Sequence, residues 1–350
     1  MRNMIYSKLG DTDIEISKIC LGTMTFGEQN TENEAHEQLD FALDNGVNFI
    51  DTAEMYPVPP KKNTQGLTEK YIGSWLNKTK RREDVIIASK VTGPAPDFSY
   101  IRDPLQIDKE NIEIAIEKNL KRLNTDYIDL YQIHWPQRQT NYFGELNYKY
   151  TKENRNQIID NINESYEALD NLVKKGKIRS IGLSNDTSWG LMKFVEISNT
   201  RLFSKIVSVQ NPYSLLNRIY EINMAEIAEI ENIKLLAYSP LGFGVLTGKY
   251  LKNSPKNARL TIWNRFNRYS NKYAKSATVE YVNLAEKFNL TPTELALSFV
   301  NNQPFVASNI IGATNLAQLE ENIKSINVKL SEEILSEIEK INQAYPNPAP

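Results

Sequence analysis

The 350 residues exceed the usual length of one domain, so either two domains or one large α/β barrel is expected. The 41 basic and 43 acidic residues give a net charge of −2, which argues against a general affinity for nucleic acid or an anionic membrane. The single cysteine excludes an intrachain disulfide, and two histidines argue against a multi-histidine zinc site, so no metal is expected.

Short β-rich segments alternate with helical ones along the chain. A turn composition at residues 9–12 predicts a small hairpin from residues 4–8 and 13–16. Eight strands are predicted after it, at residues 18–23, 47–51, 85–90, 128–134, 178–183, 206–210, 234–238 and 309–312. Helices are predicted at residues 33–45, 67–77, 112–123, 158–173, 217–231, 277–289, 293–301 and 331–343, and Asp108 is a candidate cap for the third.

Eight strands, each with a helix behind it, indicate an α/β fold of the (β/α)8 TIM barrel type. We find no composition break or proline-rich linker, so residues 1–350 are expected to form one barrel domain rather than a doubly wound two-domain protein. No run approaches the roughly 18 apolar residues of a membrane span, and the first residues lack the apolar core of a signal peptide. A cytoplasmic protein is therefore expected.

Two connections, residues 136–157 after the fourth strand and 242–276 after the seventh, are long for a compact domain. The first carries several aromatic residues, including Tyr142 and Tyr150, and the second carries several arginines. Loops of this length are usually lids or binding loops. We expect both to shape the substrate entrance and to cover a ligand.

Predicted strands two, three and four end in polar side chains, Asp51, Lys90 and His134, and Tyr56 follows five residues after Asp51. Because the carboxyl ends of barrel strands meet at one rim, these side chains are expected to converge. A lysine ammonium favours phenolate and would lower the pKa of Tyr56, while Asp51 would hold Lys90 in place. Together, Tyr56 and His134 could bind a carbonyl oxygen as negative charge develops on it. Each residue alone is more often structural, as a salt bridge or a hydrogen-bonded histidine.

The segments around these residues resemble the aldo-keto reductase superfamily, most clearly Gly46–Tyr56, Lys90 and Gln132–Trp135. Residues 134–138 and 210–218 further resemble its bacterial Tas-type members. The resemblance covers essentially the whole chain. It implies an NADP(H)-dependent oxidoreductase that reduces aldehydes or ketones, small molecules with a carbonyl group. It also implies that Tyr56 donates the proton, that Asp51 and Lys90 tune it, and that His134 orients the substrate carbonyl.

The same resemblance implies the cofactor contacts. Ser184, Asn185 and Gln210 are expected to bind the nicotinamide carboxamide, and Tyr238 to stack on the ring, although a buried structural tyrosine is the plainer interpretation of the last. The other expected contacts are Gly22, Thr23, Met24, Asp51, Ser239, Pro240, Leu241, Gly242, Lys249, Arg259, Gly312, Thr314, Gln318, Glu321 and Asn322.

Lys249 and Arg259 match basic positions near the ribose 2′-phosphate in related members, so NADPH is expected over NADH. Gln318 departs from the pattern, since many relatives have an arginine there. The arginines could otherwise belong to a solvated loop face. A Gly-x-Gly-x-x-Gly fingerprint is absent, which argues against a Rossmann protein.

Two alternatives stay open. One is a nucleotide-sensing binding protein, as in the channel β-subunits of this superfamily, which would bind the cofactor with little turnover. The other is a metal-dependent barrel hydrolase, which the small number of histidines disfavours. The physiological substrate and the oligomeric state are not assigned.

Overall fold

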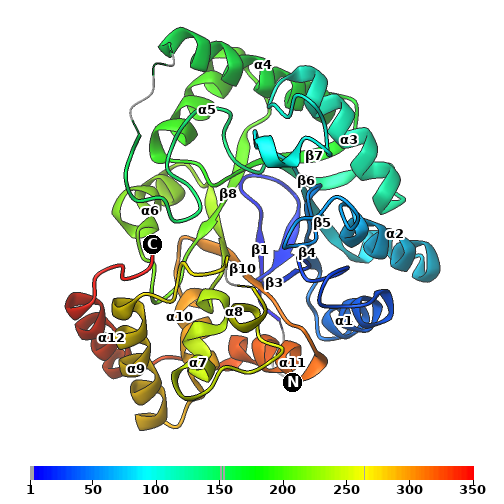
Figure 1. Ribbon diagram of the computed structural model, residues 1–350. Helices are drawn as coiled ribbons and strands as arrows, with labels where there is room; N and C mark the ends of the chain where they lie inside the picture. The colour runs from blue at the N-terminus through cyan, green and yellow to red at the C-terminus, as the bar shows by residue number, and fades with distance from the viewer. Residues whose placement is uncertain (1–3, 150–151, 153, 264) are drawn as a thin grey trace.

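Eight parallel strands form a closed barrel in the computed structural model, which describes residues 4–149, 152, 154–263 and 265–350. Helices surround the barrel (Figure 1). The strands are paired in the order β10-β3-β4-β5-β6-β7-β8-β9, which confirms the predicted (β/α)8 fold. Their bounds are Ile19–Gly22 (β3), Phe49–Asp51 (β4), Ile86–Val91 (β5), Ile128–Ile133 (β6), Ile178–Ser184 (β7), Ile206–Pro212 (β8), Lys234–Tyr238 (β9) and Val306–Ile311 (β10).

The described residues form ten longer helices around the barrel: Glu32–Asp44 (α1), Leu67–Thr79 (α2), Lys109–Leu123 (α3), Arg155–Lys174 (α4), Ser188–Arg201 (α5), Tyr220–Ile230 (α6), Lys272–Lys287 (α9), Pro292–Asn301 (α10), Leu316–Lys324 (α11) and Glu332–Ala344 (α12). Shorter helical pieces are α7 (Lys249–Lys252), α8 (Arg259–Ile262), and the 3₁₀ turns η1 (Arg82–Asp84), η2 (Pro96–Phe98), η3 (Gly242–Thr247) and η4 (Ser325–Asn327). None of these helices is long and apolar enough to span a membrane, as judged over the described residues.

Several element bounds differ from the sequence prediction. No helix was assigned at the position of α5, and β10 begins at Val306 rather than Asn309. The connection 242–276 contains η3, α7, α8 and the start of α9, so it is partly helical. Tyr150, predicted to line the other long connection, lies outside the described residues.

Local sequence signals account for several helix starts. Thr31 and Glu34 form a reciprocal capping box at α1, because each side chain bonds the other residue's backbone amide. Asp108 caps α3 through the amide of Asn111, as predicted. Behind these caps, one apolar face of each helix packs on the outside of the barrel, and strands buried on both faces suit this arrangement.

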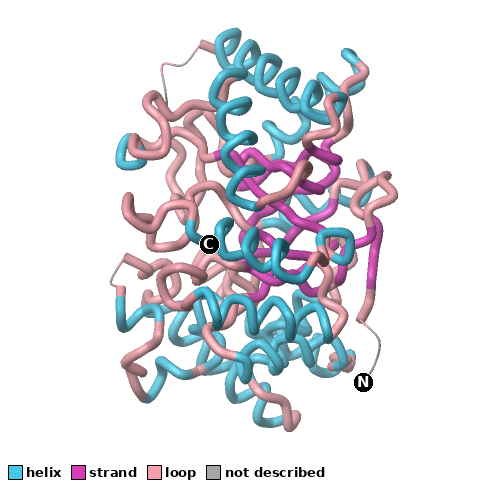
Figure 2. Tube along the Cα trace, turned by 90° about the vertical axis from the view of Figure 1, so that its right-hand side faces the viewer, coloured by secondary structure: helices cyan, strands magenta, loops and turns pink. Residues whose placement is uncertain are grey.

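An antiparallel hairpin closes the end of the barrel where the strands begin. Its strands are β1 (Tyr6–Lys8) and β2 (Glu15–Ser17), close to the predicted bounds. Leu9, Ile14 and Ile16 pack on inward-facing barrel residues, including Phe49 and Leu130. Figure 2 shows the hairpin on the right of the barrel and many of the loops gathered on the left. The barrel interior therefore opens toward the carboxyl ends of its strands.

Candidate active site

The register of the parallel strands brings the predicted polar residues to the open end of the barrel. Asp51 is paired with Gly22 and Lys90 with Gln132. On the opposite side of the barrel, Ser184 is paired with Gln210. Residues far apart in the sequence therefore share one rim because neighbouring strands end at the same level.

Asp51 and Lys90 form a buried ion pair inside this rim. The Lys90 ammonium donates to both Asp51 carboxylate oxygens, at 2.9 and 2.8 Å, and to the Thr52 carbonyl at 2.7 Å. Gln210 Nε2 donates to Asp51 Oδ1 at 2.7 Å. Lys90 is fully buried and Asp51 nearly so, and these hydrogen bonds compensate two charges that burial alone would strongly disfavour.

Tyr56 and His134 lie side by side above this pair. Their ring centroids are 5.9 Å apart in an edge-to-face arrangement, and the Lys90 ammonium lies 5.1 Å from the centroid of the Tyr56 ring. His134 is buried, and its Nδ1 has no hydrogen-bond partner among the described residues. The four residues predicted at strand ends therefore meet in one place.

The pKa values of both rings are shifted, and the shift of Tyr56 is opposite to the predicted one. Burial, reinforced by the negative charge of Asp51, raises the pKa of Tyr56 well above its ordinary value, so the predicted lowering by Lys90 is wrong. The ammonium is already paired with Asp51, which explains why its effect on the phenol does not prevail. Burial and the charge of Lys90 lower the pKa of His134 well below its ordinary value. At neutral pH the site therefore presents a neutral phenol beside a neutral imidazole.

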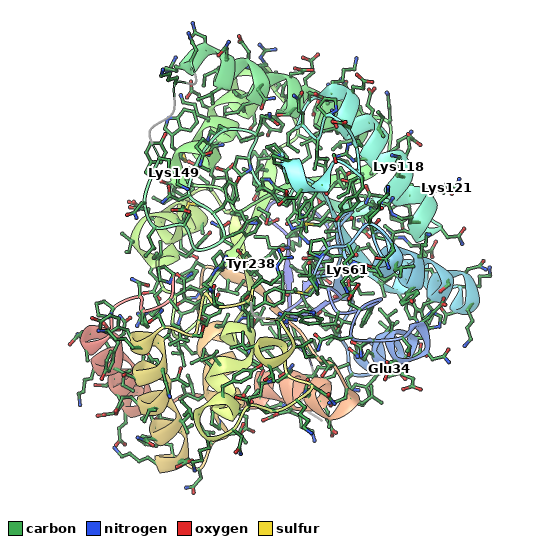
Figure 3. The ribbon with its side chains drawn as sticks, viewed as in Figure 1. Glu34, Lys61, Lys118, Lys121, Lys149 and Tyr238 are labelled. Atoms are coloured by element: carbon green, nitrogen blue, oxygen red, sulfur yellow. The ribbon has the colours of Figure 1, made fainter. Side chains whose placement is uncertain are left out.

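A second polar group faces this pair from β7, β8 and β9. Asn185 Nδ2 donates to the His134 carbonyl at 2.9 Å, and its Oδ1 accepts the Tyr238 hydroxyl at 2.6 Å. Ser184 Oγ donates to the Gln210 carbonyl at 2.8 Å. Asn185 has a φ of 53°, a left-handed conformation that asparagine tolerates better than most residues. In Figure 3, Tyr238 lies near the middle of the barrel end, whereas the labelled lysines lie farther out.

The segment after β3 runs along the segment after β10. Thr23 Oγ1 donates to the Asp51 carbonyl at 2.8 Å, while Thr25 Oγ1 lies 3.4 Å from the Ala313 carbonyl. At Gly22, a Cβ atom would lie 2.8 Å from Ile310 and 2.9 Å from the Ile311 carbonyl, so only glycine fits this crossing. Gly22 thus lies against β10, next to the predicted adenosine site, whereas Thr23 lies beside Asp51 and the Met24 carbonyl accepts the amide of Val58.

Residues 312–322 form a compact polar corner at the start of α11. Asn315 caps the helix, and the Gln318 side chain accepts from the Thr314 amide at 3.0 Å. Asn322 Nδ2 donates to the Gly312 carbonyl at 3.1 Å. Glu321, also on α11, accepts from a hydroxyl at the start of α10. An amide at position 318 therefore organises the loop but carries no charge that could bind a phosphate.

Lys249 and Arg259 are two partly buried cations in the connection after β9, which begins with Ser239, Pro240, Leu241 and Gly242. Neither forms an ion pair with a carboxylate among the residues that the structure describes. Burial lowers the pKa of both groups, and the charge of Arg259 adds to the effect on Lys249. The Lys249 ammonium packs on Gly244, where a Cβ would lie 2.8 Å from it. Two uncompensated cations of this kind favour an anionic ligand.

The two long connections meet above the site. Arg268, in the connection after β9, packs against Gly144, where a Cβ would lie 2.7 Å from its Nε. The C-terminal tail lies against the same region, since Asn271 Nδ2 donates to the Pro348 carbonyl at 2.8 Å. Arg138, in the other connection, forms a buried ion pair with Asp186 that also ties it to the β7 end.

Three groups at this rim were not predicted from the sequence. Gln132 lies inside the barrel, where its Oε1 is 3.4 Å from Gln210 Nε2. The Arg138–Asp186 pair and a buried pair between Glu54 and Arg102 were also not predicted. The position of Glu54 could have indicated its pairing, because the residues around it between Asp51 and Tyr56 are otherwise small or apolar. A carboxylate buried among such residues needs a partner.

Comparison with known proteins identifies related sequences over the whole chain. A model of the "Aldo/keto reductase family" matches residues 18–343. "Protein tas" of Escherichia coli (strain K12) is 49% identical over 349 residues, which cover 99% of this chain and 100% of that protein. "Uncharacterized oxidoreductase YrpG" of Bacillus subtilis (strain 168) is 33% identical over 99% of this chain and 97% of its own length. "Probable voltage-gated potassium channel subunit beta" of Arabidopsis thaliana is 28% identical over 98% of each chain.

Proposed function

Because the chain belongs to the aldo/keto reductase family, we propose that it reduces the carbonyl group of an aldehyde or ketone with NADPH and that Tyr56 donates the proton. One observation carries the proposal. A neutral phenol and a neutral imidazole lie side by side over a buried ammonium–carboxylate pair, at the open end of the barrel. Both rings can hydrogen-bond one carbonyl oxygen, the atom on which negative charge develops during reduction.

Each residue of the site has a different role in the reduction. When bound, the reduced nicotinamide supplies the hydride that adds to the carbonyl carbon. Tyr56 gives its phenolic proton to the carbonyl oxygen, which becomes the alcohol, and the phenolate recovers a proton from water. Lys90 stabilises the transient phenolate through its positive charge, and Asp51 holds the ammonium in place. His134, uncharged, orients the carbonyl oxygen.

The side chains at the rim fit a phosphorylated dinucleotide. Lys249 and Arg259 offer positive charge without a carboxylate partner among the described residues, which supports a 2′-phosphate and hence NADPH over NADH. Asn185, Ser184 and Gln210 supply amide and hydroxyl groups suited to a carboxamide, and Tyr238 supplies a ring for stacking. The remaining predicted contacts, at residues 22–24, 239–242 and 312–322, are proposed on the same basis.

Replacing Tyr56 by phenylalanine tests the proposal. We expect Tyr56→Phe to bind NADPH like the parent protein but to lose about 10²-fold or more of kcat on test aldehydes, because the proton donor is gone. The matched control is Tyr273→Phe, which removes a hydroxyl from an exposed tyrosine on α9 and should keep most of the activity. If Tyr56→Phe reduces aldehydes as fast as the parent, the assigned role is wrong.

The parent protein itself distinguishes the main alternative. Tight NADPH binding without turnover of any test aldehyde or ketone would favour a nucleotide-sensing protein over a reductase. NADPH fluorescence on titration and NADPH consumption under saturation separate these two outcomes.

A further inference from the structure

The catalytic segment is joined to β5 by an unusual ladder of hydrogen bonds. The amide of Thr52 donates to the Ala88 carbonyl at 2.9 Å, and the amide of Glu54 donates to the Lys90 carbonyl at 3.3 Å. At the next step the Glu54 side chain replaces the backbone, since its Oε2 accepts the amide of Thr92 at 3.0 Å. The carboxylate therefore ends the ladder two residues before Tyr56, where the chain turns away.

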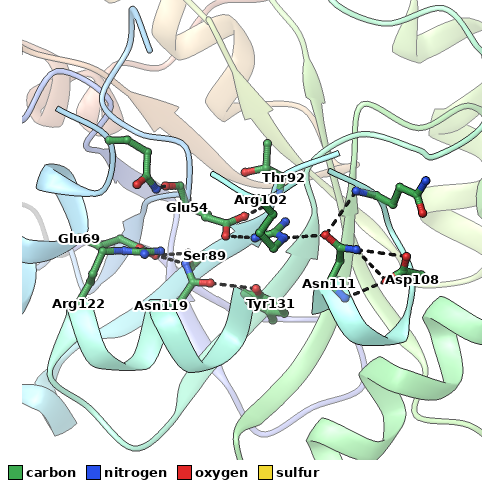
Figure 4. Close-up of polar contacts among 12 residues, drawn as sticks. Glu54, Glu69, Ser89, Thr92, Arg102, Asp108, Asn111, Asn119, Arg122 and Tyr131 are labelled. Atoms are coloured by element: carbon green, nitrogen blue, oxygen red, sulfur yellow. Dashed lines mark hydrogen bonds and ion pairs between the residues drawn. The ribbon is translucent and has the colours of Figure 1, made fainter. Parts of the chain in front are cut away.

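The other Glu54 oxygen accepts from Arg102, a residue of the connection between β5 and α3 (Figure 4). The Glu54 side chain is fully buried and that of Arg102 is 5% exposed. Arg102 Nε donates in turn to Asn111 Oδ1 at 2.8 Å, in the first turn of α3. Two charges so far from solvent are retained only where several hydrogen bonds fix their positions.

The connection that Arg102 fixes carries half of an aromatic wall beside Tyr56. We define the aromatic wall as Phe98, Tyr100, Trp135 and Tyr142. The rings of Phe98 and Trp135 are 6.5 Å apart, and Trp135 and Tyr142 are also 6.5 Å apart. These residues form one apolar cluster with small and aliphatic side chains from both segments, namely Ala53, Met55, Ile101 and Leu105, and Tyr56 packs on it.

Glu54 and Arg102 thus each lie directly beside members of this cluster in the sequence: Ala53 and Met55 flank the carboxylate, and Ile101 precedes the guanidinium. Their ion pair spans the junction between the segment that carries the proton donor and the segment that carries Phe98 and Tyr100. A shift of either segment would change the distance between the Tyr56 hydroxyl and the aromatic wall.

We propose that the Glu54–Arg102 ion pair is a positioning device that holds the aromatic wall against Tyr56, in a pocket that takes carbonyl compounds with a flat aromatic body. The inference rests on the proposed reductase function for its kinetic part. Stacked and edge-to-face contacts with the wall favour an aromatic substrate over a small aliphatic one. Because ring contacts depend on geometry, the preference should be lost when the wall moves.

A second buried pair in the same region provides a matched control. Glu69 on α2 accepts from Arg122 Nε at 2.6 Å and from Ser89 Oγ at 2.6 Å (Figure 4). Its side chain is also fully buried, and Asn119 completes its hydrogen bonds. This pair joins α2, α3 and β5 on the outside of the barrel, and the partners of Glu69 (Ser89, Asn119 and Arg122) include no member of the aromatic wall. The two glutamates are thus alike in burial and pairing but differ in what they position.

The experiment compares Glu54→Gln with Glu69→Gln. Both changes remove a buried negative charge and should lower the melting temperature. For Glu54→Gln we expect the ratio of kcat/KM for benzaldehyde to kcat/KM for propanal to fall about tenfold, with little change in the Kd for NADPH. For Glu69→Gln the ratio should stay within about twofold of the parent. Equal changes in the ratio for both variants, or an unchanged ratio for Glu54→Gln, would overturn the inference.

A binding measurement keeps the test independent of turnover. Benzamide is flat and aromatic but is not an aldehyde or ketone, and calorimetry with NADP⁺ present should show weaker benzamide binding to Glu54→Gln than to Glu69→Gln and the parent. If the parent reduces no carbonyl compound, the proposed function fails while this comparison still decides the inference. Benzamide binding that is absent from the parent, or equal in all three proteins, refutes the positioning role.

The double variant Glu54→Gln/Arg102→Met separates positioning from stability. It removes the guanidinium that Glu54→Gln leaves without a charged partner, so the melting temperature should recover in part. The aromatic preference should remain lost, since nothing then ties the two segments together. Recovery of both properties would show that the uncompensated charge, and not the tie, caused the defect.

Discussion

Replacing Lys90 by methionine tests how the buried ammonium acts. Its Nζ lies 5.1 Å from the centroid of the Tyr56 ring. With an effective dielectric constant of about 20, a unit charge at that distance stabilises a phenolate by about 3 kcal/mol. If that stabilisation is fully expressed in the transition state, Lys90→Met lowers kcat by about 200-fold. The rate is measured as NADPH consumption with a saturating aldehyde, and NADPH binding is measured separately.

The single substitution also leaves the Asp51 carboxylate buried without its cation, which typically costs about 3–5 kcal/mol of stability. The double variant Asp51→Asn/Lys90→Met controls for this, because it is neutral and its asparagine oxygen can still accept from Gln210. We expect the double variant to recover stability but not rate. A rate within about twofold of the parent in either stable variant would refute the electrostatic reasoning.

Three further predictions concern the charges described above and Lys18, a residue that directly precedes β3 and donates to the Val306 carbonyl. Since the pKa of His134 is lowered and that of Tyr56 is raised, both side chains stay neutral, and kcat/KM should be constant from about pH 6 to 9. A change in kcat/KM near the ordinary pKa of histidine would contradict this. Lys249→Met and Arg259→Met should each weaken NADPH binding about tenfold and change NADH binding little, as measured by fluorescence titration. Equal losses of affinity for both nucleotides would rule out a contact with the 2′-phosphate. Burial lowers the pKa of Lys18 to about 8, so its charged form costs roughly 3 kcal/mol of stability below that pH, and the cost fades as pH rises toward the unfolded value. Lys18→Met should therefore raise the free energy of unfolding more at about pH 7 than at about pH 10, and a gain independent of pH would exclude this cause.

Hydropathy patterns predicted the barrel because parallel strands buried on both faces are nearly continuous apolar runs. Helices with one apolar stripe were also found, including α3 and α12. Helix α5 was not assigned because its apolar residues do not form one stripe: Phe194 is buried, whereas Trp189 and Met192 on the same helix are 43% and 38% exposed. Periodicity alone cannot recognise such a helix.

The site was predictable where its residues lie at or just after strand ends, because the strand ends of a barrel converge whatever conformation the loops adopt. Asp51, Tyr56, Lys90 and His134 were named for that reason. The sign of the Tyr56 pKa shift was not predictable, since it depends on burial and on which partner takes the Lys90 charge. Likewise, the Glu54–Arg102 pair joins residues 48 positions apart, one of them in the connection between β5 and α3. No local pattern in the sequence specifies such a contact.

Cys20 can serve as a natural probe of how often the closed barrel opens. It is the only thiol in the chain, and it lies fully enclosed among the hairpin and the inward faces of the strands. Burial also raises its pKa well above the ordinary thiol value, so very little reactive thiolate forms while the barrel stays intact. The rate at which a thiol reagent labels the protein would therefore report how often strands and hairpin separate, without any introduced label.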